Sequence, residues 1–125
     1  WYAEQQQQAL QVAELTNAAL SMDEAMAEGA EIYSRNCVAC HQANGQGMPP
    51  AFPALAGSAK ATGDIGVTMD TLVNGVPGTA MAAYGRQLNP IELASIITYV
   101  RNAFGNQSGD MVQPAEVNEF IVGGQ

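Results

Sequence analysis

The chain has 125 residues, which is enough for one small domain, and 47% of them are apolar, although large core side chains are few. Twelve acidic residues against four basic ones give a net charge of -8, which argues against binding to a nucleic-acid backbone, because that requires clustered lysine and arginine. Two explanations of the acidity stay open, namely solubility and a partner protein with a basic docking face. No run of 18 apolar residues is present, so no membrane span is predicted.

The first predicted helix begins after a polar N-terminal segment. Residues 1–20 are rich in alanine and glutamine without a continuous apolar stripe, and we expect a solvated helical linker there. Ser21 with Glu24 three positions later is the pattern of a capping box and predicts a helix that runs to about Asn36. One face of this helix carries residues at helical spacing, which are Ala25, Gly29, Ile32 and Tyr33.

Two long loops and a short helix are predicted in the middle of the chain. Residues 41–63 are rich in glycine and proline and predict a loop, whose length is explained if it wraps a ligand. A short helix is expected from Ile65 or Thr68 to Val73, ended by Asn74 and Gly75. A second loop follows at residues 75–88.

The last predicted helix starts at Asn89, with Pro90 at the first helical position and Glu92 at the third. Its apolar stripe predicts an end near Gly105 and consists of Leu93, Ile96, Ile97, Val100 and Phe104. Residues 106–125 are polar with glycine and proline, so we expect an extended tail. Strand patterning is absent almost everywhere, and the fold class is predicted to be all-α.

Both cysteines and the only histidine lie in the stretch NCVACHQ, residues 36–42, as Cys37, Cys40 and His41. A thioredoxin-like thiol pair would need a strand before the motif, and a structural zinc site would need a fourth ligand. Cys-x-x-Cys-His is instead the attachment pattern of c-type haem, in which the two cysteines form thioethers and the histidine ligates iron. We favour covalent attachment of one haem c, with zinc and thiol chemistry as the alternatives.

A second axial ligand is predicted at Met81. Haem iron with histidine on one side takes methionine or histidine on the other, or stays open for a small molecule. No second histidine exists, and Met81 lies in a loop between two helices, flanked by small residues that let backbone approach a ring. The alternative is that Met81 only covers an open face, which would suit a ligand sensor.

The order of these features resembles a class I cytochrome c over about residues 22–105, so residues 21–105 are assigned to that domain. Gly29, Tyr33 and Cys37 have the spacing of the family's N-terminal helix, GTAMAAYG resembles its methionine loop, and IITYVRN resembles its C-terminal helix. FPALAGS resembles the loop whose proline carbonyl accepts a hydrogen bond from the proximal histidine. The resemblance therefore implies that Pro53 orients His41.

A narrower resemblance concerns the segment from Gly75 to the tail, which is similar to the cytochrome c domain fused to subunit II of some bacterial haem-copper oxidases. It implies single-electron transfer from a cytochrome c or a quinol:cytochrome c reductase to the copper site of the oxidase. The isolated domain would then be an electron-transfer module rather than an enzyme. We also expect a soluble fragment on the periplasmic face, attached to the membrane only through its parent subunit. The alternative is a free periplasmic monohaem carrier.

Overall fold

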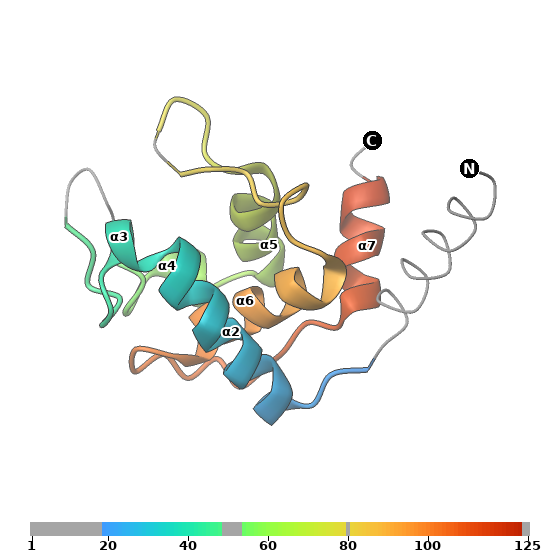
Figure 1. Cartoon of the computed structure of the whole chain (residues 1–125), viewed down its shortest axis with the longest axis horizontal. Coiled ribbons are helices and arrows are strands. Elements are labelled where there is room, and N and C mark those ends of the chain that lie inside the picture. Colours follow the sequence, from blue (N-terminus) through green and yellow to red (C-terminus); the bar gives the residue numbers. More distant parts are fainter. Residues whose placement is uncertain (1–18, 49–53, 80, 124–125) are drawn as a thin grey trace.

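Helices alone make up the regular structure of the described part of the chain. The computed structural model describes residues 19–48, 54–79 and 81–123. Its helices are α2 (Met22–Asn36), α3 (Val38–His41), α4 (Ala59–Thr62), α5 (Ile65–Asn74), α6 (Pro90–Asn102) and α7 (Pro114–Gly123), and these ranges contain no strand (Figure 1). The predicted all-α fold class is confirmed for these ranges. The predicted linker, residues 1–20, lies almost entirely outside the described residues.

The two long helices begin where the sequence predicted. The Ser21 hydroxyl accepts from the Glu24 amide at 3.1 Å, while the Glu24 carboxylate accepts from the Ser21 amide at 3.0 Å. Asn89 and Glu92 form the same reciprocal pair at the start of α6, with Pro90 at the first helical position. Each cap satisfies backbone donors that the helix itself leaves without a partner, worth about 1 kcal/mol.

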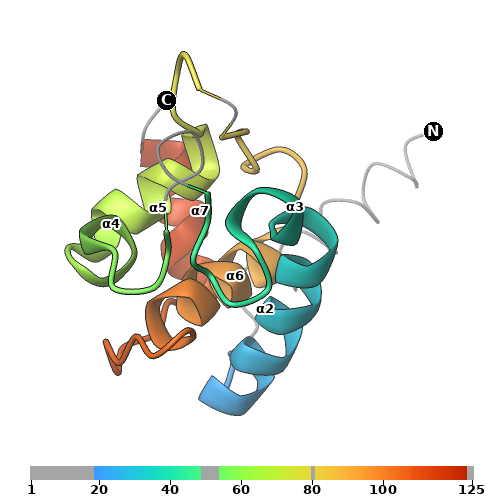
Figure 2. The same cartoon turned by 90° about the vertical axis from the view of Figure 1, so that its left-hand side faces the viewer.

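The crossing of α2 and α6 organises the core (Figures 1 and 2). Gly29 makes the close approach possible, because a Cβ there would lie 2.4 Å from the Tyr99 Cβ and 2.6 Å from the Ser95 carbonyl oxygen. The ring centroids of Tyr33 and Tyr99 are 5.7 Å apart across this interface. The core is completed by buried side chains of α2, α5 and α6 and of the tail, including Ile32, Met69, Leu72, Leu93, Ile96, Ile97 and Val112.

The predicted short helix is confirmed as α5, which runs from Ile65 to Asn74 with Asp64 capping its start. Gly75 ends it with a φ of +70°, a conformation that glycine adopts without steric cost. The predicted loop of residues 41–63 differs in one respect, because its end forms the single helical turn α4.

Helix α6 ends earlier than predicted, at Asn102 rather than near Gly105. The carbonyl of Val100, which would accept from the amide of Phe104 in a longer helix, accepts instead from the Asn106 side-chain amide at 2.8 Å. Phe104 then takes a φ of +61° and packs its ring 4.9 Å from that of Tyr33.

The prediction of an extended tail is wrong for its second half, which forms α7. Pro114 stands at the first helical position, and the Glu116 carboxylate accepts from the Gln113 amide at 3.3 Å. Gln113 also exchanges two hydrogen bonds with the backbone of Leu20, at 2.8 and 3.0 Å. Because Val112 and Val117 are fully buried, the tail belongs to the core.

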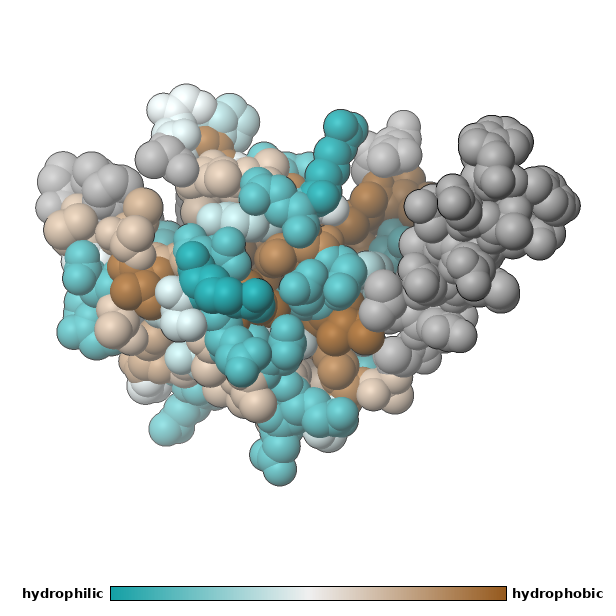
Figure 3. All heavy atoms as spheres, in the orientation of Figure 1, coloured by the Kyte–Doolittle hydropathy of each residue, from teal (hydrophilic) through white to brown (hydrophobic). Residues whose placement is uncertain are grey.

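No helix in the described ranges is long and apolar enough to cross a bilayer. On the face shown in Figure 3, hydrophilic side chains cover α2. The carboxylates of Asp23, Glu24 and Glu31 on this helix are exposed. Part of the protein's negative charge therefore lies on the solvent-exposed surface of α2.

Candidate functional site

The segment that carries both cysteines and the histidine is a single helical turn at the end of α2. Cys37 ends α2 and begins α3, and its carbonyl accepts from the amides of Cys40 at 3.3 Å and His41 at 2.9 Å. All three side chains are half-buried. The turn therefore presents two sulfurs and one imidazole within five residues, as the sequence spacing suggested.

The chemistry of Cys37 does not match that of a redox thiol. Both cysteines are free, and burial, followed by the proximity of Cys40, raises the pKa of the Cys37 thiol to about 11. Such a thiol is protonated at neutral pH, whereas exchange-active cysteines have lowered pKa values. The described residues also contain no group of three or more Cys, His, Asp or Glu side chains placed to hold a metal ion. The zinc interpretation would require four such ligands.

The chain leaves this turn through a strained residue. Gln42 has a φ of +67°, one of two positive values among the described residues other than glycine. Its carbonyl accepts from the hydroxyl of Tyr33 and from the amide of Gly45, the latter at 3.1 Å. The carbonyl of His41 accepts from the amide of Gly47 at 2.9 Å. Several hydrogen bonds thus define the backbone that follows the histidine.

The loop that carries Met81 is held against the end of α5. The Met81 carbonyl accepts from the Val76 amide at 3.3 Å, and the Met81 amide donates to the Thr79 hydroxyl at 3.2 Å. At Gly75, an added Cβ would lie 2.7 Å from the Met81 carbonyl oxygen, so only glycine lets the loop pass this close. The Met81 side chain is half-buried.

The structure packs two of the predicted residues against the same buried core. Cys37 and Met81 both belong to the partly buried side chains that pack against the same core cluster. The two segments are also joined directly, because the hydroxyl of Tyr84, three residues after Met81, donates to the carbonyl of Asn36 at 3.3 Å. Pro53 lies outside the described residues, so its predicted role towards His41 stays a prediction.

The donor set fits a covalently attached haem. Two free thiols and an imidazole on one turn, with a thioether in a separate loop, are the groups that c-type haem uses. Several partly buried apolar side chains pack against the buried core cluster, among them Cys37, Val38, Leu55, Ile65, Met81, Tyr84 and Leu88. A large apolar group placed against them would complete their burial.

Sequence reasoning missed three polar side chains that hold the loops in place. The side-chain amide of the buried Asn106 donates hydrogen bonds to the carbonyls of Leu55 and Val100, and its oxygen accepts from the amide of Gly57. The hydroxyl of Tyr84 donates to the carbonyl of Asn36. No sequence pattern predicts these contacts, because the partners are backbone groups, and all of them except Val100 lie about 50 residues away.

The third of these side chains is Arg101, which is 3% exposed and lies between several elements. Its guanidinium donates to both carboxylate oxygens of Asp110 at 2.9 and 2.8 Å and to the Thr68 hydroxyl at 3.0 Å. These hydrogen bonds, above all, lower the pKa of Asp110 below its usual value. The ion pair between Arg101 and Asp110 links the start of the tail to α6. The hydrogen bond from Arg101 to Thr68 links α6 to α5.

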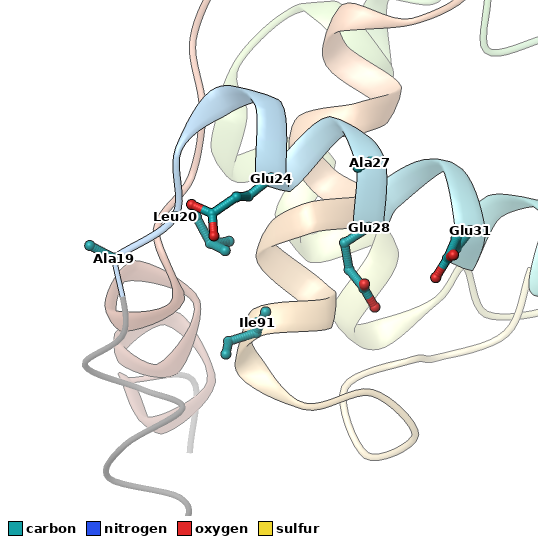
Figure 4. Close-up of a pocket in the computed structure, with 7 residues that line it drawn as sticks. All are labelled: Ala19, Leu20, Glu24, Ala27, Glu28, Glu31 and Ile91. Atoms are coloured by element: carbon teal, nitrogen blue, oxygen red, sulfur yellow. The ribbon is translucent and has the colours of Figure 1, made fainter.

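A separate pocket of about 480 Å³ lies between α2 and the start of α6 (Figure 4). It is lined by Ala19, Leu20, Glu24, Ala27, Glu28, Glu31 and Ile91, and none of the predicted site residues contributes to it. This pocket is therefore distinct from the segments that carry Cys37 and Met81.

Comparisons with known proteins agree with this donor set. Residues 24–100 match the family model described as "Cytochrome C oxidase, cbb3-type, subunit III". Cytochrome c-552 of Thermus thermophilus is 35% identical over 95 residues, covering 66% of this chain and 64% of that protein. A cbb3-type cytochrome c oxidase subunit of Azorhizobium caulinodans is 33% identical over 103 residues. These residues cover 77% of this chain and 33% of the Azorhizobium subunit.

A more distant relative is the cytochrome c subunit of the alcohol dehydrogenase (quinone) of Gluconobacter oxydans. It is 28% identical over 102 residues, which cover 74% of this chain and 21% of that protein. The chain therefore spans about a fifth of this relative and close to two thirds of cytochrome c-552.

Proposed function

The chain belongs to the cytochrome c family whose model is described as cbb3-type oxidase subunit III and accordingly carries covalent haem c; from this premise we propose how its own residues hold the haem and serve electron transfer. The observation that carries the proposal is the single turn with Cys37, Cys40 and His41, facing the same core as the half-buried Met81. When bound, the haem supplies the one-electron couple.

Each site residue has a distinct role in this proposal. Cys37 and Cys40 would hold the group through thioether bonds, and the imidazole of His41 and the sulfur of Met81 would donate to its iron. Pro53 accepts a hydrogen bond from His41 through its carbonyl and so orients the imidazole. Residues 21–105 contain all five, while residues 106–123 support them through the contacts of Asn106, Asp110 and Val112 with α6.

Replacing Met81 tests the ligand set. Met81→Ala in the haem-loaded chain should bind carbon monoxide rapidly in the ferrous state, whereas the parent protein should not. The midpoint potential of the variant should fall, because a thioether ligand favours ferrous iron. Met48→Ala is the matched control, since Met48 is 47% exposed and should change neither property. An unchanged visible spectrum in Met81→Ala would contradict the assignment.

The finer proposal is that this module passes electrons from a cytochrome c or a quinol:cytochrome c reductase to the copper site of an oxidase subunit II on the periplasmic side. Its support is the resemblance of the methionine loop and tail to that fused domain. A free periplasmic carrier is the second candidate, favoured by the similar size of cytochrome c-552. Haem staining of fractionated membranes would separate them. A haem-stained band of subunit II size that binds copper supports the fused domain, and a small haem protein outside the membrane supports the carrier.

The partner is expected to present a basic face. The net charge of -8 and the exposed carboxylates on α2 favour association with a positively charged protein. Such association should weaken as ionic strength rises, because salt screens exposed charges. Electron-transfer rates with a basic donor that do not change with added salt would contradict this expectation.

A further inference from the structure

Two tyrosine hydroxyls reach the two ends of the segment that carries the cysteines and the histidine. The hydroxyl of Tyr33 donates to the carbonyl of Gln42, which directly follows His41. The hydroxyl of Tyr84 donates to the carbonyl of Asn36, which directly precedes Cys37. All three attachment residues therefore lie between two carbonyls that tyrosines hold.

The Tyr33 hydrogen bond acts on a backbone conformation that needs support. A positive φ at a residue such as Gln42 is costly and persists only where the surroundings determine it. Tyr33 is well placed to supply that support, because its side chain is 2% exposed and its ring packs 4.9 Å from Phe104 and 5.7 Å from Tyr99. A rigid ring thus holds the peptide group that follows Gln42, one residue beyond His41.

The Tyr84 hydrogen bond connects two segments that are 48 residues apart. The amide of Tyr84 donates to the Leu72 carbonyl at 2.9 Å and the amide of Gly85 to the Val73 carbonyl at 3.0 Å, so α5 fixes this part of the loop. Met81 lies three residues earlier on the same loop. The hydroxyl of Tyr84 therefore links the Met81 loop to the turn that carries His41.

We propose that Tyr33 and Tyr84 are positioning residues that hold the two axial ligands in register. Tyr33 fixes the backbone next to His41, and Tyr84 ties the loop of Met81 to the same turn from the other end. The inference rests on the proposed function above, because it assumes that His41 and Met81 ligate the iron. It assigns the hydroxyl groups, rather than the rings, a role in that site.

Removing one hydroxyl at a time tests this role in the haem-loaded full chain. Tyr84→Phe should increase carbon monoxide binding by the ferrous protein by about three- to tenfold, as expected when a hydrogen bond that favours the closed loop is lost. Tyr33→Phe should shift the midpoint potential away from that of the parent protein. Tyr99→Phe is the matched control, because its ring belongs to the same cluster and its hydroxyl makes no hydrogen bond to a described residue. It should change neither property.

The outcomes separate this inference from the proposal on which it rests. Lower thermal stability in Tyr33→Phe and Tyr84→Phe, with unchanged potential and unchanged carbon monoxide binding, would reduce both hydroxyls to structural roles and overturn the inference. If Met81→Ala nevertheless binds more carbon monoxide than the parent protein, the assignment of Met81 as a ligand stands although the inference about the tyrosines fails. No change in Met81→Ala would overturn both.

Discussion

The helix crossing and the two loops that border the site are held together in different ways. Where α2 crosses α6, the contact is made by close-packed side chains around Gly29, and its geometry depends on the absence of a Cβ. The described parts of the two loops, residues 42–48, 54–58, 75–79 and 81–88, instead combine backbone hydrogen bonds with side-chain hydrogen bonds from Tyr33, Tyr84 and Asn106 to backbone carbonyls. The crossing is therefore vulnerable to added volume, and the loops are vulnerable to the loss of one polar group.

This difference follows from what each region has to do. A helix satisfies its own backbone groups, so two helices need only complementary surfaces to pack. A loop satisfies only some of its backbone groups with other backbone groups, and side chains from elsewhere supply part of the remaining partners. Substitutions in the two regions should consequently differ in size and in kind.

The largest effect is expected from Gly29→Ala. The added methyl group would meet the Tyr99 Cβ and the Ser95 carbonyl, which cannot move without separating the helices, so we expect a loss of about 3 kcal/mol or more. Denaturant unfolding of the haem-loaded chain measures this. Gly123→Ala is the control, because no atom lies within 4 Å of a Cβ there. Equal stability of Gly29→Ala and the parent would mean that the crossing is not tightly packed.

A smaller loss is expected from Asn106→Ala, which tests the loops. The substitution would leave the Leu55 and Val100 carbonyls and the Gly57 amide without the side-chain partners they now have at 2.8–3.0 Å. Unpaired buried groups of this kind should cost about 2 kcal/mol in total. Asn74→Ala, which removes an exposed hydrogen bond to Asp70, should cost less than about 0.5 kcal/mol. Thermal unfolding of both variants checks the difference, and equal losses would contradict it.

The smallest effect concerns acid stability and Asp110. Its pKa is lowered in the folded protein, mainly by hydrogen bonds from Arg101, so its contribution is present above the pKa of the unfolded chain and is lost as pH falls through the folded value. Because the Asp110 side chain is 44% exposed, we expect Asp110→Asn to cost about 1 kcal/mol at pH 7.

Unfolding at pH 7 and at pH values below 4 measures this contribution. The difference between Asp110→Asn and the parent protein should shrink in acid, where the parent carboxylate becomes protonated. Asp70→Asn is the control, since that carboxylate accepts from the Asn74 amide rather than from a guanidinium. A difference that stays constant from pH 7 into acid would show that the ion pair does not contribute in this way.

Local sequence patterns predicted the helices wherever a cap was recognised. Ser21 with Glu24 and Asn89 with Glu92 marked the starts of α2 and α6, and Gly75 marked the end of α5. The start of α7 carries a related signal, Pro114 followed by Glu116, which would have predicted this helix as well. The end of α6 could not be predicted, because the group that interrupts it is the side chain of Asn106, which returns from beyond the helix.

By itself, the sequence determined the all-α fold, the family and the attachment turn, because caps, helical spacing and Cys-x-x-Cys-His are all local patterns within a few residues. It also suggested Gly29 as a crossing point and Met81 as a ligand. Only the tertiary structure decided that Tyr33 and Tyr84 hold the carbonyls on either side of that turn, and that Arg101 and Asn106 bind the tail and a loop to α6. These contacts join a side chain to a backbone group or a charge that folding brings next to it, and backbone groups are the same at every position. No residue pattern could therefore specify which one is reached.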